Sequence, residues 1–152
     1  MSQPILHALA FDQLTARTLH DLVRLRIDVF VVEQRCPYAE LDGRDVEPTT
    51  RHLWLSDDAR PVAYLRILAE PDGERRIGRV CVAASHRGKR LADRLLLDAL
   101  AQLTASDPDA DVVLDAQAHL AGWYERLMFC PDGEGFVEDG IPHVPLRLSR
   151  GT

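Results

Sequence analysis

Long apolar runs are missing from this chain, and their absence limits where the protein can act. No stretch of its 152 residues approaches the ~20 uninterrupted apolar residues that a membrane helix needs. Residues 1–14 also lack the charged and apolar regions of a secretory signal. We therefore expect a cytoplasmic protein with no membrane partner.

The chain also lacks an excess of basic residues. The 18 lysines and arginines are outnumbered by 24 aspartates and glutamates, which gives a formal net charge of -6. Proteins that bind duplex nucleic acid draw much of their affinity from cations that neutralise phosphates. The composition predicts no nucleic-acid partner, so any anion-binding site must be local.

Cysteine is too sparse and too scattered for a disulfide framework or a zinc ribbon. Cys36, Cys81 and Cys130 are odd in number and form no C-x-x-C pair. We expect reduced thiols, no metal site and no catalytic cysteine. Repeats and Gly/Ser linkers are absent too, and 152 residues fit one compact domain that covers residues 1–152.

Hydrophobic periodicity, broken by short Pro, Gly and Asp clusters, predicts strands and helices in alternation. Thr15 can cap a first helix, which the β-branched run 29–32 weakens before Glu33. Three β-rich runs with tight turns between them indicate an antiparallel meander. The pattern predicts an α+β or α/β sandwich around a mixed sheet. Its expected elements are strands at 5–11, 52–56, 61–69, 76–82, 111–117 and 144–148, and helices after residue 15, at 91–106 and at 120–129.

Residues 36–50 separate the first helix from the meander and are expected to form a long loop. They contain two prolines, a glycine and several acids. Loops of this length usually have a function, and the acids favour a cationic amine as a ligand. These acids are Glu40, Asp42, Asp45 and Glu47.

Cations crowd the start of the helix at residue 91, where the positive end of the helix dipole normally favours acids. Asp93 is the only acid nearby, so this helix start is unfavourable unless an anion completes it. Gly88 would let the backbone approach such an anion closely, and N–H groups at a helix start can cradle phosphate. A solvated basic helix end is the alternative. The cations are His86, Arg87, Lys89, Arg90 and Arg94.

The segment 79–92 resembles the acyl-CoA-binding motif Q/R-x-x-G-x-G/A of GNAT acyltransferases. Arg87 stands at its first position and Ala92 at its last, while Arg90 replaces its middle glycine. The resemblance is closer to the ElaA-like subgroup and extends over nearly the whole chain. The matching signatures are Arg26 to Gln34, Cys36-Pro-Tyr, Glu40, Asp42-Gly, Asp45, Thr50, His52-Leu, Ala116-Gln-Ala-His119, Tyr124 and Glu138-Asp-Gly-Ile-Pro-His143.

This resemblance implies a GNAT-like three-layer fold with about four helices and a mixed, mostly antiparallel sheet of six to seven strands. It implies that the sheet splays between strands 4 and 5, and that acetyl-CoA (coenzyme A) binds in the splay. Main-chain groups of the fourth strand would bind the pantetheine arm, and N–H groups at the helix start would bind the pyrophosphate. The implied cofactor-binding residues are Val80, Cys81, Val82, Arg87, Gly88, Lys89, Arg90, Leu91, Ala92 and Gln117.

Acyl transfer to an amine needs a base for the amine and an acid for the departing thiolate. Tyr124 lies in a segment that resembles the GNAT segment whose tyrosine protonates coenzyme A, and a phenol stays protonated at neutral pH. Met128 stands where that family usually has a glycine. Glu33 leads the candidates for the base. The other candidates, which together with Gln34 are expected to contact the substrate, are Asp45, His52 and His143.

The sequence therefore predicts an N-acetyltransferase that moves an acetyl group from acetyl-CoA to a primary amine by direct attack in a ternary complex. The acceptor is a small molecule or a peptide, and the protein is a monomer or a homodimer. Two alternatives stay open. One is a non-catalytic acyl-CoA sensor in which Tyr124 only packs. The other is a metal-dependent hydrolase that uses His52, His119, His143 and either Glu33 or Asp45, for which no metal-binding spacing is present.

Overall fold

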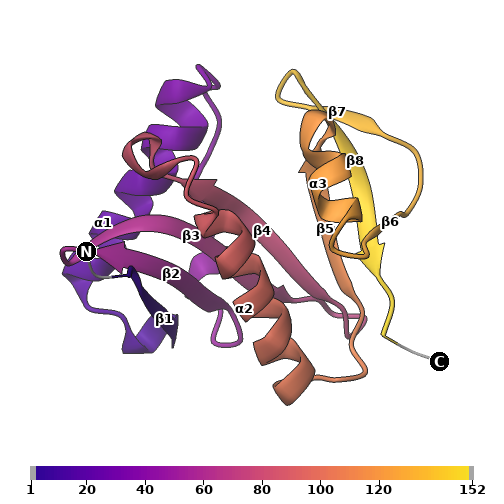
Figure 1. Ribbon diagram of the computed structural model, residues 1–152, viewed down its shortest axis with the longest axis horizontal. Helices are drawn as coiled ribbons and strands as arrows, with labels where there is room; N and C mark the ends of the chain where they lie inside the picture. Colours follow the sequence, from indigo (N-terminus) through magenta and orange to yellow (C-terminus); the bar gives the residue numbers. More distant parts are fainter. Residues whose placement is uncertain (1–2, 151–152) are drawn as a thin grey trace.

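The computed structural model describes residues 3–150, which form one mixed sheet with helices on both faces (Figure 1). The sheet order is β1-β2-β3-β4-β5-β8-β6, and β7 also pairs with β8. Within these residues, no helix has the length and apolarity to cross a bilayer. The helices are α1 (Ala16–Ile27), α2 (Leu91–Ser106) and α3 (Ala121–Glu125). The strands are β1 (Ile5–Ala10), β2 (Arg51–Asp57), β3 (Arg60–Ala69), β4 (Arg75–Val82), β5 (Val112–Gln117), β6 (Cys130–Pro131), β7 (Phe136–Glu138) and β8 (Ile141–Leu148).

Strands β4 and β5 run parallel and separate soon after they meet. They pair through residues 75–76 and 112–113, and beyond these the two halves of the sheet diverge (Figure 1). A β-bulge lies on β4 in the diverging part, where Arg79 and Val80 oppose a single residue of β3. Arg79 has a positive φ of 55°. Because bulges bend a strand and increase its twist, this one favours the splay.

Two apolar clusters cover the two faces of the sheet. On the face covered by α2 and α3, here the α2 face, Leu95 packs with Leu65 and Leu146 at the centre of the larger cluster. On the opposite face, the α1 face, Leu22 packs with Trp54. Burying a side chain of this size stabilises a fold by ~1.5–3 kcal/mol, so both clusters fix the helices firmly to the sheet.

The structure confirms the predicted fold class and the splay between the fourth and fifth strands. It confirms the Thr15 cap, whose hydroxyl oxygen accepts a hydrogen bond from the N–H of Thr18 at 3.1 Å. Residues 3–150 contain eight strands rather than six or seven, because β6 and β7 are pieces of two and three residues that pair with β8. Between residues 3 and 150 there are three α-helices rather than about four.

Two predicted boundaries differ from the structure. The helix expected at 120–129 ends at Glu125, because the chain turns through Met128, whose φ is 77°. Strand β8 begins at Ile141 rather than at residue 144. Its residues Pro142 and Pro145 hide it in the sequence, since proline is rare within strands.

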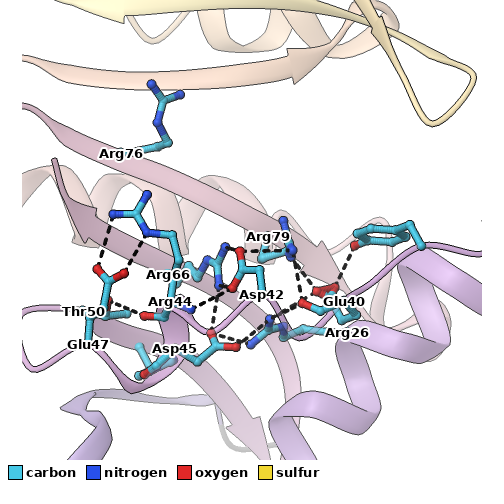
Figure 2. Close-up of polar contacts among 12 residues, drawn as sticks. Arg26, Glu40, Asp42, Arg44, Asp45, Glu47, Thr50, Arg66, Arg76 and Arg79 are labelled. Atoms are coloured by element: carbon cyan, nitrogen blue, oxygen red, sulfur yellow. Dashed lines mark hydrogen bonds and ion pairs between the residues drawn. The ribbon is translucent and has the colours of Figure 1, made fainter.

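A buried ion network anchors the loop between α1 and β2 to the α1 face (Figure 2). Arg26 of α1 is 0% exposed and donates to both carboxylate oxygens of Asp45, at 2.9 and 3.1 Å. Arg66 of β3 also donates to Asp45, at 3.0 Å, and to Asp42. The two arginines lower the pKa of the Asp45 carboxyl, although its burial alone would raise it. Asp45 is therefore an ionised link between a helix and a strand.

The network extends to the bulge in β4. Arg79 donates to the carboxylate and to the main-chain carbonyl of Glu40, and Arg26 donates to the same carboxylate at 3.2 Å. The hydroxyl of Tyr38 donates to its other oxygen at 2.8 Å. Because arginines neutralise these loop acids, the loop gives no evidence for a cationic acceptor.

Asp45 and His52, which the sequence placed at the substrate, belong instead to this buried structure. They are 4% and 0% exposed. The Nε2–H of His52 donates to the carbonyl of Asp45 at 3.0 Å, and its Nδ1 accepts from the hydroxyl of Tyr64 at 2.6 Å. Burial lowers the pKa of His52, so the ring is neutral. We correct this prediction: both residues stabilise the fold, and neither is accessible to a substrate.

Replacing Asp45 by Asn should destabilise the protein strongly. The change removes the charged carboxylate that the buried guanidiniums of Arg26 and Arg66 share, and breaking a buried ion pair from one side costs about 3 kcal/mol or more. Urea denaturation measures the change in the free energy of unfolding. Glu47→Gln is the matched control, because its ion pair with Arg44 is partly exposed and contributes about 0.5 kcal/mol. Equal stability of the two variants would contradict the role given to the network.

Candidate active site

The splay opens a cleft of about 760 Å³ between β4 and β5. Its walls come from both faces of the sheet: α3 contributes from the α2 face, and the segment after α1 contributes from the α1 face. The tight turn between β7 and β8 also contributes. Of the residues predicted for the site, the structure brings ten together here. They are Glu33, Gln34, Val80, Cys81, Val82, Arg87, Ala92, Gln117, Tyr124 and His143.

The other predicted cofactor residues lie at the start of α2, outside the lining of the cleft. Gly88, Lys89 and Arg90 are exposed, while Leu91 is 6% exposed and packs in the core. Leu91 can therefore offer a ligand only its main chain.

The start of α2 retains free main-chain donors. No side chain from residues 3–150 caps this helix of 16 residues, and its N-cap residue is Arg90, in the left-handed conformation with φ 56°. Gly88 also has a positive φ, of 80°, and a Cβ there would meet no atom within 4 Å. A left-handed residue is where glycine is normally favoured, which explains the glycine that Arg90 replaces. The uncapped N–H groups and the exposed cations fit an anion.

Arg87 and Glu33 form a bidentate ion pair at the mouth of the cleft. Glu33 ends a π-helical turn, Asp28–Glu33, that continues α1, and its carboxylate oxygens accept from Arg87 at 2.6 and 2.7 Å. These hydrogen bonds lower the pKa of the Glu33 carboxyl. Arg87 also donates to the carbonyl of Val82, at 3.1 and 3.2 Å. The ion pair weakens the case for Glu33 as a base, because a carboxylate so engaged holds a proton poorly.

Tyr124 of α3 lines the cleft with a protonated phenol. The residue is 5% exposed, and its hydroxyl makes no hydrogen bond to another residue between 3 and 150. Burial raises its pKa to about 12, so it stays neutral at physiological pH. Trp123 packs edge-on against it, with ring centroids 4.6 Å apart, and donates its indole N–H to Asp93 of α2 at 2.8 Å. The acid candidate is thus tied to the helix of the anion site.

Cys81 lines the cleft but is no nucleophile. Its side chain packs in the cluster on the α1 face, and burial raises the pKa of the thiol to about 12. The nucleophile in thiol chemistry is the thiolate, which this environment opposes. Cys81 is therefore no candidate for a catalytic thiol.

Several residues that line the cleft were not predicted as site residues from the sequence. Arg76 and Asp115 face each other across the opening, with Nη1 of the arginine 3.2 Å from a carboxylate oxygen. A single acid inside an apolar strand was a signal that Asp115 faces something polar. Arg79 gave no comparable signal, because only the bulge turns it toward the cleft. The lining also includes Tyr38 and His119, and the sequence proposed His119 only for the metal-dependent alternative.

The comparisons with known proteins agree with this geometry. The model of the "Acetyltransferase (GNAT) domain" matches residues 18–150. A UPF0039 protein of Mycobacterium tuberculosis is 47% identical over 137 residues, which cover 88% of this chain and 85% of the relative. Protein ElaA of Escherichia coli is 41% identical over 139 residues, which cover 89% and 90%.

Two solved structures are similar to this chain in both fold and sequence. An acyl-CoA N-acyltransferase from Pseudomonas aeruginosa superposes with a TM-score of 0.91 at 39% identity, over 95% of this chain and 99% of that one. The crystal structure of Escherichia coli ElaA superposes with a TM-score of 0.90 at 37% identity and the same coverage. Because the matched region contains the whole cleft, the chain belongs to the GNAT acetyltransferase family and is an ElaA-like protein.

Proposed function

We propose that the protein transfers an acetyl group from acetyl-CoA to a primary amine, by direct attack within a ternary complex. The observation that carries this proposal is the splay itself. The cleft contains the edge of β4 that is not paired with β5, and the uncapped basic start of α2 lies beside it. The cleft is also lined by a neutral phenol that makes no hydrogen bond within residues 3–150. The GNAT acyltransferase fold supports acyl transfer from acyl-CoA.

The residues around the splay fit acyl-CoA in two ways. Main-chain groups of β4 beyond Arg76 have no partner on β5, although the carbonyl of Val82 accepts from Arg87. Buried backbone groups need a partner. An extended pantetheine arm carries amide groups and could pair with residues 80–82 as a strand would. The N–H groups of residues 87–92 and the cations among them would hold the pyrophosphate. Bound in this way, acetyl-CoA would supply the thioester.

Within such a complex, the chain's own groups would direct the charges that develop during transfer. An N–H of residues 80–82 would stabilise negative charge on the acyl oxygen. Tyr124 would donate its proton to the departing thiolate. Its raised pKa keeps the phenol protonated when the thioester binds. The acceptor amine would approach from the opposite side of the splay.

Tyr124→Phe should lower kcat by roughly tenfold or more while leaving the dissociation constant of acetyl-CoA unchanged. The variant removes only the proton donor, because the phenol makes no hydrogen bond to residues 3–150 that packing depends on. Steady-state release of coenzyme A against a panel of amines measures kcat, and calorimetry measures the dissociation constant. Equal rates for the two proteins would remove Tyr124 from the mechanism. Saturable binding with no turnover on any amine by the unmodified protein would favour the sensor.

Lys89→Glu should weaken the binding of coenzyme A by about tenfold and leave the binding of pantetheine, which lacks phosphate, unchanged. The residue is exposed beside the uncapped start of α2, so reversing its charge opposes the pyrophosphate alone. Arg17→Glu is the matched control, because it makes the same change of charge on an exposed residue of α1. Equal losses for coenzyme A and pantetheine would contradict a phosphate site at this helix.

A further inference from the structure

The neutral ring of His143 is held in one tautomer. Its Nδ1 lies 2.7 Å from the carbonyl oxygen of Ile141. A carbonyl can only accept a hydrogen bond, so Nδ1 carries the proton and the neutral ring has its lone pair on Nε2. No hydrogen bond joins Nε2 to any residue between 3 and 150, and His143 lines the cleft.

The orientation of this ring is fixed as well. Phe136 of β7 pairs with His143 of β8 in the sheet, and the two rings stack with centroids 5.6 Å apart and planes 12° apart. Gly135 precedes this pair, and a Cβ there would lie 3.1 Å from the main-chain oxygen of His143. The absence of that side chain lets the loop pack closely against β8. The lone pair is therefore held in place rather than carried by a mobile side chain.

His143 and Tyr124 reach the cleft from opposite faces of the sheet. Gln117 of β5 and His143 of β8 are directly paired, so their side chains lie on the same face. Their neighbours Ala116 and Val144 pack in the core under α2 and α3, which places the pair on the α1 face. Tyr124 comes from α3 on the α2 face. The cleft therefore has an acid candidate on one side of the splay and a base candidate on the other.

Apart from His119, the other candidates for a base are engaged by other groups or buried. Glu33 is held by Arg87 in a bidentate pair, and Asp115 is paired with Arg76. Asp45 and His52 are buried outside the cleft. His119 lines the cleft, is exposed and makes no hydrogen bond that would fix its tautomer among residues 3–150. The other charged side chains of the lining are Arg66, Arg79, Glu138 and Asp139.

We infer that His143 is the catalytic base of the proposed reaction. As the amine nitrogen forms its bond to the acyl carbon, Nε2 of His143 takes a proton from that nitrogen. The bond between carbon and sulfur breaks, and the thiolate takes the proton of Tyr124. The products are an amide and coenzyme A, and solvent restores both side chains. This assignment rests on the proposed function and replaces Glu33 as the leading base.

His143→Gln should lower kcat by about 100-fold near neutral pH, the range that general base catalysis commonly contributes. The dissociation constant of acetyl-CoA should not change, and the limb of the pH–rate profile that reports the base should disappear. His143→Ala should regain activity with added imidazole. His20→Gln, on the exposed surface of α1, is the control for losing a histidine.

The outcomes of these experiments distinguish a failure of this inference from a failure of the proposed function. If the unmodified protein turns over amines and His143→Gln keeps its rate and pH profile, the base assignment is wrong and the proposed function stands. If the basic-group limb of the pH–rate profile disappears in His119→Gln and not in His143→Gln, the base is His119. Absence of turnover by the unmodified protein would overturn both. Nitrogen NMR of the unmodified protein at a pH where the ring is neutral gives a readout free of folding defects. The tautomer protonated on Nδ1 is expected, and the tautomer protonated on Nε2 would contradict the inference.

Discussion

The separation of β4 from β5 is the constraint on which the rest of the structure depends. Two parallel strands in the middle of a sheet normally pair along their length, because a buried main-chain group without a partner is costly. Here the pairing stops at residues 76 and 113. The cleft, the access of Tyr124 to it and the unpaired edge of β4 all follow from that interruption. A ligand with its own amide groups would complete the edge, which gives the fold a physical reason to bind one.

Ion pairs between charged side chains stabilise β4 at the bulge, where it separates from β5. Arg79 sits in the bulge of β4 and is bound by Glu40. Glu40 is bound in turn by Arg26, which α1 presents to the sheet. The loop that carries Glu40 therefore couples the position of α1 to the shape of β4. The acids of this loop stabilise the fold, so they are not evidence of a surface that binds cationic ligands.

Local rules predicted the parts of the fold that depend on local interactions. The Thr15 cap, the meander of β2 to β4 and the amphipathic α2 all follow from residues close in sequence. The pairings of Asp45 with Arg26 and of Glu33 with Arg87 span 19 and 54 residues, and no periodicity reports them. For this reason Asp45 appeared to be a surface acid and Glu33 a free base. His143 was recognised as a candidate, but its tautomer depends on a carbonyl that only the strand geometry places.

The claim that acyl-CoA lies along the open edge of β4 is tested most directly by hydrogen–deuterium exchange. Amides of residues 77–82 should exchange more slowly when acetyl-CoA is added, because the pantetheine arm would cover and pair with them. Amides of β1, at the far edge of the sheet, should exchange at the same rate with and without it. Saturation with acetyl-CoA that leaves exchange at residues 77–82 unchanged would contradict the account.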